Sequence, residues 1–174
     1  MEKLKTVKGT HDLLDEDFQI IDKVIEISEE VSRSFNFEKI STPIIEFSDL
    51  FSKTLGQGSD IVQKEMYTFI DQGKESITLR PEGTAAVARA LISNSLYEKI
   101  SQKYFYHGPM FRRERPQAGR LRQFHQFGVE SFNQDSFLCD LEVILLAKKI
   151  LRALALDEDL ELQLNTLGTF ETRL

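Results

Sequence analysis

The feature that most constrains this chain is a pair of strand-like segments joined by an arginine-rich connection. Residues 103–111 and 123–132 are rich in aromatic residues, which favour strands. The connection between them is polar and contains proline and glycine, and its arginines are Arg112, Arg113, Arg115, Arg120 and Arg122. This pattern predicts a β-hairpin with a long basic tip.

The rest of the first half alternates helical and strand patterns. A helix with an acidic polar face is expected to begin at a cap, Asp12 or Asp15, and to end near Phe35, because apolar residues recur there at helical spacing. Residues 39–46 predict a strand in which Pro43 indicates an edge, a bulge or an interface position. Residues 49–63 predict a loop, since their Gly-Gln-Gly lacks the strand and further glycines of a phosphate-binding loop.

A second hairpin and further helices complete the plan. Residues 66–70 and 76–80 flank a polar turn and predict an antiparallel hairpin, followed by a helix from about Thr84 to residue 92. A helix is expected over 140–156 and a strand over 160–165. Hairpins mixed with helices, without regular βαβ alternation, indicate an α+β fold with a mainly antiparallel sheet flanked by helices.

Composition fits one globular domain. The chain has 174 residues, of which 41% are hydrophobic and 29% charged, and its single cysteine excludes an internal disulfide. No segment is apolar enough to serve as an anchor, so we expect a cytoplasmic protein with no membrane partner. The net charge of −6 argues against general affinity for polyanions, but the basic tip has to be judged separately.

Strand alternation gathers polar residues on one face of the long hairpin. Phe124, Gln126 and Glu130 share one face of their strand, and Arg112 and Glu114 belong to an alternate set of the other strand that can lie beside them. An amide and carboxylates in a row are unlike a core face. This face is therefore expected to present a cation, an amide and two carboxylates.

A second polar group lies at the junction between residues 76–80 and the following helix. Glu82 and Thr84 stand where side chains often face a cleft. The simpler alternative is a turn made by Pro81 and Gly83, with Thr84 capping the helix. Together with Glu130, Glu82 could hold an ammonium group, while Arg112 could bind a phosphate or carboxylate and Phe124 could stack on a flat ring.

The basic tip and the histidines also have simpler structural interpretations. Five arginines could form a solvated hairpin tip, or they could contact the phosphates of an RNA end. For His11, His107 and His125 a metal site is not expected, because no pair has ligand spacing and there is no cysteine cluster. They are interpreted as packing or hydrogen-bonding residues.

These segments together resemble the class II aminoacyl-tRNA synthetases, most closely the histidyl-tRNA synthetase family. Residues 78–84 (TLRPEGT) are similar to the family's amino-acid-binding segment, and residues 108–130 (GPMFRRERPQ followed by GRLRQFHQFGVE) are similar to its motif 2. Residues 8–13 (KGTHDL) resemble its opening. The first helix and the strand with Pro43 resemble motif 1, which implies a homodimer through this region.

The resemblance assigns roles to the polar residues. It implies that Arg112 is catalytic and contacts the ATP α-phosphate, and that Glu114 and Phe124 hold the adenine. Histidine binding falls to Glu82, Thr84, Gln126 and Glu130. Contact with the tRNA acceptor end falls to Arg113, Arg115, Gln117 and Arg120.

The implied activity is that of a histidine–tRNA ligase. Histidine and ATP, with Mg²⁺, would give histidyl-adenylate, and the histidyl group would pass to tRNA(His). Residues 1–174 would be the N-terminal part of the catalytic domain, without motif 3 and the anticodon-binding domain, so the chain alone is expected to be inactive or very weak. A non-catalytic synthetase-like regulatory subunit of ATP phosphoribosyltransferase is the alternative, although it has no need for an intact motif 2 loop.

Overall fold

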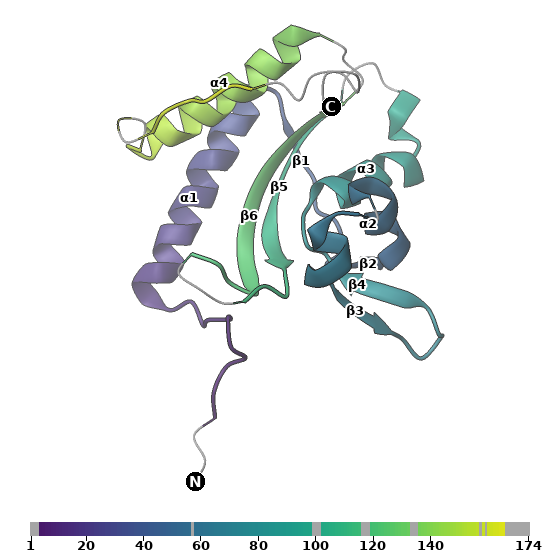
Figure 1. Ribbon diagram of the computed structural model, residues 1–174. Coiled ribbons are helices and arrows are strands. Elements are labelled where there is room, and N and C mark those ends of the chain that lie inside the picture. Colours follow the sequence, from purple (N-terminus) through teal and green to yellow (C-terminus); the bar gives the residue numbers. More distant parts are fainter. Residues whose placement is uncertain are drawn as a thin grey trace.

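The long hairpin predicted around the basic tip forms the centre of the fold. β5 (Gln102–Phe111) and β6 (Gln123–Phe132) pair antiparallel, from Gln102 opposite Phe132 to Phe111 opposite Gln123. β1 (Glu38–Lys39) joins β5 in parallel and gives the strand order β1-β5-β6. This computed structural model describes residues 4–56, 58–98, 102–115, 119–132, 136–156, 158 and 160–165 (Figure 1).

A second, smaller sheet contains the other predicted hairpin. β3 (Tyr67–Ile70) and β4 (Ser76–Leu79) pair antiparallel, and β2 (Ile45–Phe47) pairs antiparallel with the other edge of β4. Its strand order is β2-β4-β3. Both hairpins and the α+β class with mainly antiparallel pairing are thereby confirmed.

Helices cover both faces of the central sheet. α1 (Asp15–Ser34) and α4 (Phe137–Ala153) lie together on one side of β5 and β6, and α3 (Thr84–Ser93) lies on the other (Figure 1). The first side is closed by a buried cluster of Val31, Phe37, Phe105 and Leu146. The α3 side is closed by Val87, Leu91, Tyr104, Tyr106 and Met110.

Helix α1 differs from the prediction at its start and on its surface. Its N-cap is Leu14, which makes no side-chain cap bond, and Asp15 is already the first helical residue, so neither predicted cap is used. Three acidic residues in the first turn instead favour the helix through its dipole. Phe18 and Val24, two of the apolar residues at helical spacing, are exposed, whereas Ile25 beside Val24 is half-buried.

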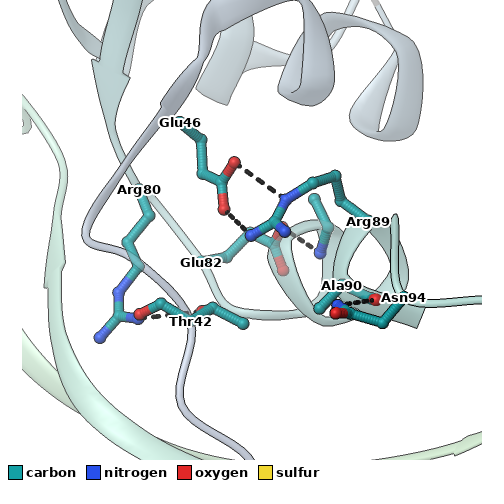
Figure 2. Close-up of polar contacts among 8 residues, drawn as sticks. Thr42, Glu46, Arg80, Glu82, Arg89, Ala90 and Asn94 are labelled. Carbon is teal, nitrogen blue, oxygen red and sulfur yellow. Dashed lines mark hydrogen bonds and ion pairs between the residues drawn. The ribbon is translucent and has the colours of Figure 1, made fainter. Parts of the chain in front are cut away.

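The single strand predicted over 39–46 is wrong, because the segment is divided between the two sheets. β1 ends at Lys39 and β2 begins at Ile45, with Pro43 between them. A proline has no N–H to give to a ladder, so pairing stops there. Arg80 bridges the crossing. Its Nη1 donates to the Thr42 carbonyl at 3.0 Å (Figure 2). Its Nε donates to the Pro109 carbonyl at 3.0 Å.

The loop predicted over 49–63 is also wrong. It contains most of α2 (Ser48–Leu55) and the start of a π-helix, η1 (Ile61–Glu65). Phe51 is fully buried, so tertiary packing stabilises a helix for which the short sequence signal was weak. A 3₁₀ turn, η2 (Leu96–Glu98), follows α3.

The strand predicted over 160–165 does not form. These residues belong to no strand of the structure, and Leu160, Leu162 and Leu164 are exposed. Leu160 and Leu162 line a groove beside α4. Alternating leucines indicate a strand only where another strand pairs with them. Within the ranges described, no helix is long and apolar enough to cross a membrane.

Candidate active site

The predicted polar face lies on the α3 side of the central sheet. The register places Tyr106 opposite Gly128, Tyr104 opposite Glu130 and Met110 opposite Phe124. Residues at even positions of both strands therefore share this face, as their alternation predicted. Part of the face is core, and the part near the start of α3 is polar.

The turn between β4 and α3 brings Glu82 to the start of the helix. Its carboxylate accepts two backbone hydrogen bonds, from Thr84 N to Oε2 at 2.6 Å and from Ala85 N to Oε1 at 2.9 Å. Glu82 is buried, with 7% of its surface exposed, and it satisfies two of the N–H groups that a helix start leaves unpaired. The simpler alternative, in which the Thr84 side chain caps the helix, is therefore wrong, because Glu82 provides the cap.

Thr84 instead connects the two carboxylates of the predicted histidine site. Its hydroxyl donates to Glu130 Oε1 at 2.7 Å, while its backbone N–H donates to Glu82. Tyr106 OH donates to the same Glu130 oxygen at 3.2 Å. Burial raises the pKa of Glu130, against the effect of these two donors. A cation bound here would offset that cost of burial.

Gln126 lies on the same strand as Glu130. Its side-chain Oε1 is buried and accepts no hydrogen bond from the described residues. A buried acceptor without a donor is costly, so this oxygen favours a ligand that brings an N–H group.

Arg112 lies at the far end of the same face. Its Nε donates to the Pro81 carbonyl at 2.9 Å, and its Cζ lies 5.2 Å from the centroid of the Phe124 ring. These two contacts fix the guanidinium against the turn that carries Glu82. An open cleft of about 580 Å³ adjoins it, lined by Glu65, Arg112, Glu114, Gly119, Arg120, Leu121, Phe124 and His125.

Only some of the described side chains of the basic tip form hydrogen bonds within the protein. Glu114 accepts a hydrogen bond from Arg120 Nη1 at 3.1 Å, and 61% of the Arg120 side chain is exposed. Arg113 and Arg115 are exposed as well, although the Arg113 N–H donates to the Glu65 carbonyl at 2.7 Å. Gln117 lies outside the described residues.

Two partners of the site were not predicted from the sequence. Tyr106 falls on the same face as Arg112 by alternation, but alternation alone gives it no role. Glu65 was assigned to no site, since only the fold brings η1 to the basic tip. The only sequence signal for Tyr106 is its place in the alternation, since Gly83 and Gly128, which enclose its ring, are distant in sequence.

The three histidines lie on or near the opposite, α1 side. They line a cavity of about 330 Å³ between α1 and the sheet, and His107 Nε2 lies 3.2 Å from Glu29 Oε1. In the described part of the chain, no three residues among His, Cys, Asp and Glu gather so as to hold a metal ion.

Comparison with known proteins supports the resemblance over almost the whole length. Residues 9–173 match the family described as histidyl-tRNA synthetase. The chain is 53% identical over 173 residues to a histidine–tRNA ligase of Gluconobacter oxydans (strain 621H), which covers 99% of this chain and 42% of that protein. The chain therefore spans about two fifths of this curated relative.

Solved structures show the same fold. An apo S. aureus histidyl-tRNA synthetase superimposes with a TM-score of 0.72 at 37% identity, covering 87% of this chain and 35% of that one. A Bacillus halodurans protein described as an ATP phosphoribosyltransferase regulatory subunit/histidyl-tRNA synthetase gives a TM-score of 0.73 at 25% identity, covering 85% and 37%. From the match over residues 9–173 and the 53% identity to a curated member, the chain belongs to the histidyl-tRNA synthetase family.

Proposed function

We propose that the protein containing this chain is a cytoplasmic histidine–tRNA ligase, which activates histidine with ATP and transfers it to tRNA(His). The observation that carries the proposal is the pair of carboxylates, Glu82 and Glu130, joined through Thr84 on the face that also bears Arg112. Family membership and the bacterial relatives support it. Location follows from the use of tRNA in cytoplasmic translation.

The histidine subsite would be built on the polar end of this face. Burial raises the pKa of Glu130, so a cationic N–H group such as an ammonium or imidazolium would stabilise its ionised carboxylate. The unpaired Gln126 Oε1 would accept a second N–H. Thr84 and Glu82 would complete the pocket, since Thr84 already contacts both carboxylates.

The ATP subsite would occupy the cleft beside Arg112. Phe124 offers a ring face for the adenine and Glu114 offers acceptors for its amino group. Arg112 is held through Nε, and within the described ranges no residue accepts from its two terminal nitrogens, which could bind phosphate oxygens. Glu65 and Glu114 line the same cleft and have the oxygen ligands that Mg²⁺ prefers, together with phosphates. Bound Mg²⁺ would neutralise phosphate charge.

The chemical step follows from this placement. A histidine carboxylate oxygen would attack the α-phosphorus, the bond to the β-phosphate oxygen would break, and pyrophosphate would leave. Negative charge grows on the equatorial oxygens, so a guanidinium fixed beside them could lower the barrier by about 3 kcal/mol. A terminal ribose hydroxyl of tRNA would then attack the carbonyl carbon of the adenylate and take the histidyl group, with AMP as the leaving group, near exposed Arg113, Arg115 and Arg120. Gln117 would contact the same acceptor end.

Dimerisation through motif 1 is the further part of the proposal. Ile45 and Phe47 of β2 are 51% and 60% exposed, and Phe69 of β3 lies on the same face of the small sheet. Large exposed apolar patches favour a protein interface. Ile45→Asp should raise the monomer fraction in sedimentation, whereas Leu156→Asp, exposed after α4, should not.

Residues 1–174 would form the N-terminal part of the catalytic domain, with motifs 1 and 2. Because the chain covers 42% of its Gluconobacter oxydans relative, we expect the isolated chain to activate histidine very weakly or not at all. Tests of activity therefore use the complete protein that contains it.

Histidine-dependent exchange between ATP and pyrophosphate tests the proposal. The proposal expects exchange activity in the complete protein. Arg112→Ala should reduce this activity by at least 100-fold, and Arg152→Ala on α4 should retain it. A regulatory subunit would bind histidine without exchange, so binding with no exchange in the unaltered protein would favour that alternative. The Bacillus halodurans structure, whose description includes both roles, is the reason to keep it.

A further inference from the structure

Tyr106 is clamped between two glycines. Its ring is 4% exposed and lies between Gly83 of the β4–α3 turn and Gly128 of β6. A Cβ atom at Gly83 would lie 2.1 Å from Tyr106 Cε2, and one at Gly128 would lie 2.3 Å from Cζ. Both distances are far below van der Waals contact, so only glycine at these positions leaves room for the ring.

The clamp directs the phenol to one oxygen of Glu130. Tyr106 OH lies 3.2 Å from Oε1, which also accepts from Thr84 Oγ1 at 2.7 Å. Burial raises the pKa of Tyr106, so its phenol keeps its proton and acts as a donor. No described residue donates to Glu130 Oε2. The carboxylate therefore has one oxygen held by the protein and one left as an acceptor.

We infer that Tyr106 is a positioning residue, which holds Glu130 Oε1 so that Oε2 accepts an N–H group of a cationic ligand. That this ligand is histidine rests on the proposed function. The hydrogen bond itself is a property of the chain and can be tested without ligand. Tyr106 touches no substrate in this scheme and acts only through Glu130.

The test compares Tyr106→Phe with Tyr104→Phe. Tyr104 lies two residues earlier on the same face and is 8% exposed, but its hydroxyl donates to Gln102 Oε1 at 2.5 Å. Both variants keep the aromatic ring and lose one buried hydroxyl group. The first readout is the titration of Glu130 by NMR of ¹³C-labelled glutamate side chains, assigned with Glu130→Gln.

Tyr106→Phe should raise the Glu130 titration midpoint by about 1 pH unit, because the ionised form loses a donor. Tyr104→Phe should leave it unchanged. An unchanged midpoint in Tyr106→Phe overturns the inference, whether or not histidine binds. If the substitution prevents folding, biosynthetic fluorotyrosine replaces it: a more acidic phenol donates more strongly, so the midpoint should fall, and no change again overturns the inference.

The second readout is calorimetric titration of the complete protein with histidine. Affinity should fall about tenfold in Tyr106→Phe and remain unchanged in Tyr104→Phe. A shifted Glu130 midpoint with unchanged histidine affinity overturns the positioning role. A shifted midpoint in a protein that binds no histidine at all leaves the fixed carboxylate established and refutes the proposed function instead.

Discussion

Arg89 holds Glu46 through two hydrogen bonds, from Nε to Oε2 at 3.1 Å and from Nη2 to Oε1 at 2.5 Å (Figure 2). Arg89 lies on α3 and Glu46 on β2, so this ion pair joins the helix that begins at Thr84 to the small sheet. Only 8% of the Glu46 side chain is exposed, against 30% for Arg89. The pair therefore contributes to placing the start of α3 beside Glu130.

Arg89→Leu is expected to lower the free energy of unfolding by about 3 kcal/mol, because it leaves the Glu46 carboxylate buried without its partner. The double variant Glu46→Leu/Arg89→Leu should recover part of this loss, since both charges are then removed. Urea denaturation of the three proteins measures the difference.

An exposed pair supplies the control. Lys64 and Asp60 form an ion pair at 2.9 Å, with side chains 70% and 77% exposed. Lys64→Leu is expected to leave stability almost unchanged, because solvent screens an exposed ion pair. Equal effects of Lys64→Leu and Arg89→Leu would contradict the role given to burial.

Gly128→Ala is expected to destabilise the fold by about 1–3 kcal/mol, because its new methyl group would overlap the Tyr106 ring. Gly58→Ala is the matched control, as no described atom outside Gly58 and its two chain neighbours lies within 4 Å of its added Cβ. Thermal unfolding of both variants measures the effect. A Gly128→Ala protein as stable as Gly58→Ala would mean that the ring moves aside at little cost.

The central hairpin and its faces were predictable because period-two alternation acts locally. Residues 123–132 alone separate Phe127 and Val129, which pack toward α1 and α4, from Gln126 and Glu130 on the other face. The same alternation predicts that Arg112 lies beside Phe124, and in the structure Arg112 Cζ is 5.2 Å from the centroid of the Phe124 ring. The roles assigned to these residues stay proposals.

The unpredicted parts depend on contacts between distant segments. The chain crosses from one sheet to the other at Pro43, and Arg80 stabilises that crossing by bonding to Thr42 and Pro109. No local sequence pattern predicts such a contact. Residues 160–165 show the reverse case, since their alternating pattern predicts a strand and the structure has none there.

The raised pKa of Glu130 makes stability depend on pH with a definite sign. Between the pKa of an unfolded glutamate, about 4.3, and the higher folded value, the native state binds more protons than the unfolded state. This contribution to stability is complete below the unfolded pKa and is lost as the pH rises through the folded one. Glu130→Gln abolishes it.

Unaltered protein should therefore lose stability relative to Glu130→Gln as the pH rises from 4 to 8. Urea midpoints of both proteins across this range give the comparison. Parallel curves would show that the two hydroxyl donors fully offset the burial of this carboxylate, and would contradict the direction of its pKa.

Salt dependence tests whether the basic tip binds RNA. Each arginine that binds a phosphate releases condensed counterions, so the slope of log K against log salt should shrink by about 0.7 for every arginine–phosphate pair that a substitution removes from a single-stranded end. Arg113→Gln, Arg115→Gln and Arg120→Gln in the complete protein should each show this with tRNA. Gln117→Ala should weaken binding without changing the slope, because it carries no charge. Arg152→Gln on α4 should leave both the affinity and the slope unaltered. If none of the three tip substitutions changes the slope, the tip is a solvated hairpin end that does not bind RNA phosphates.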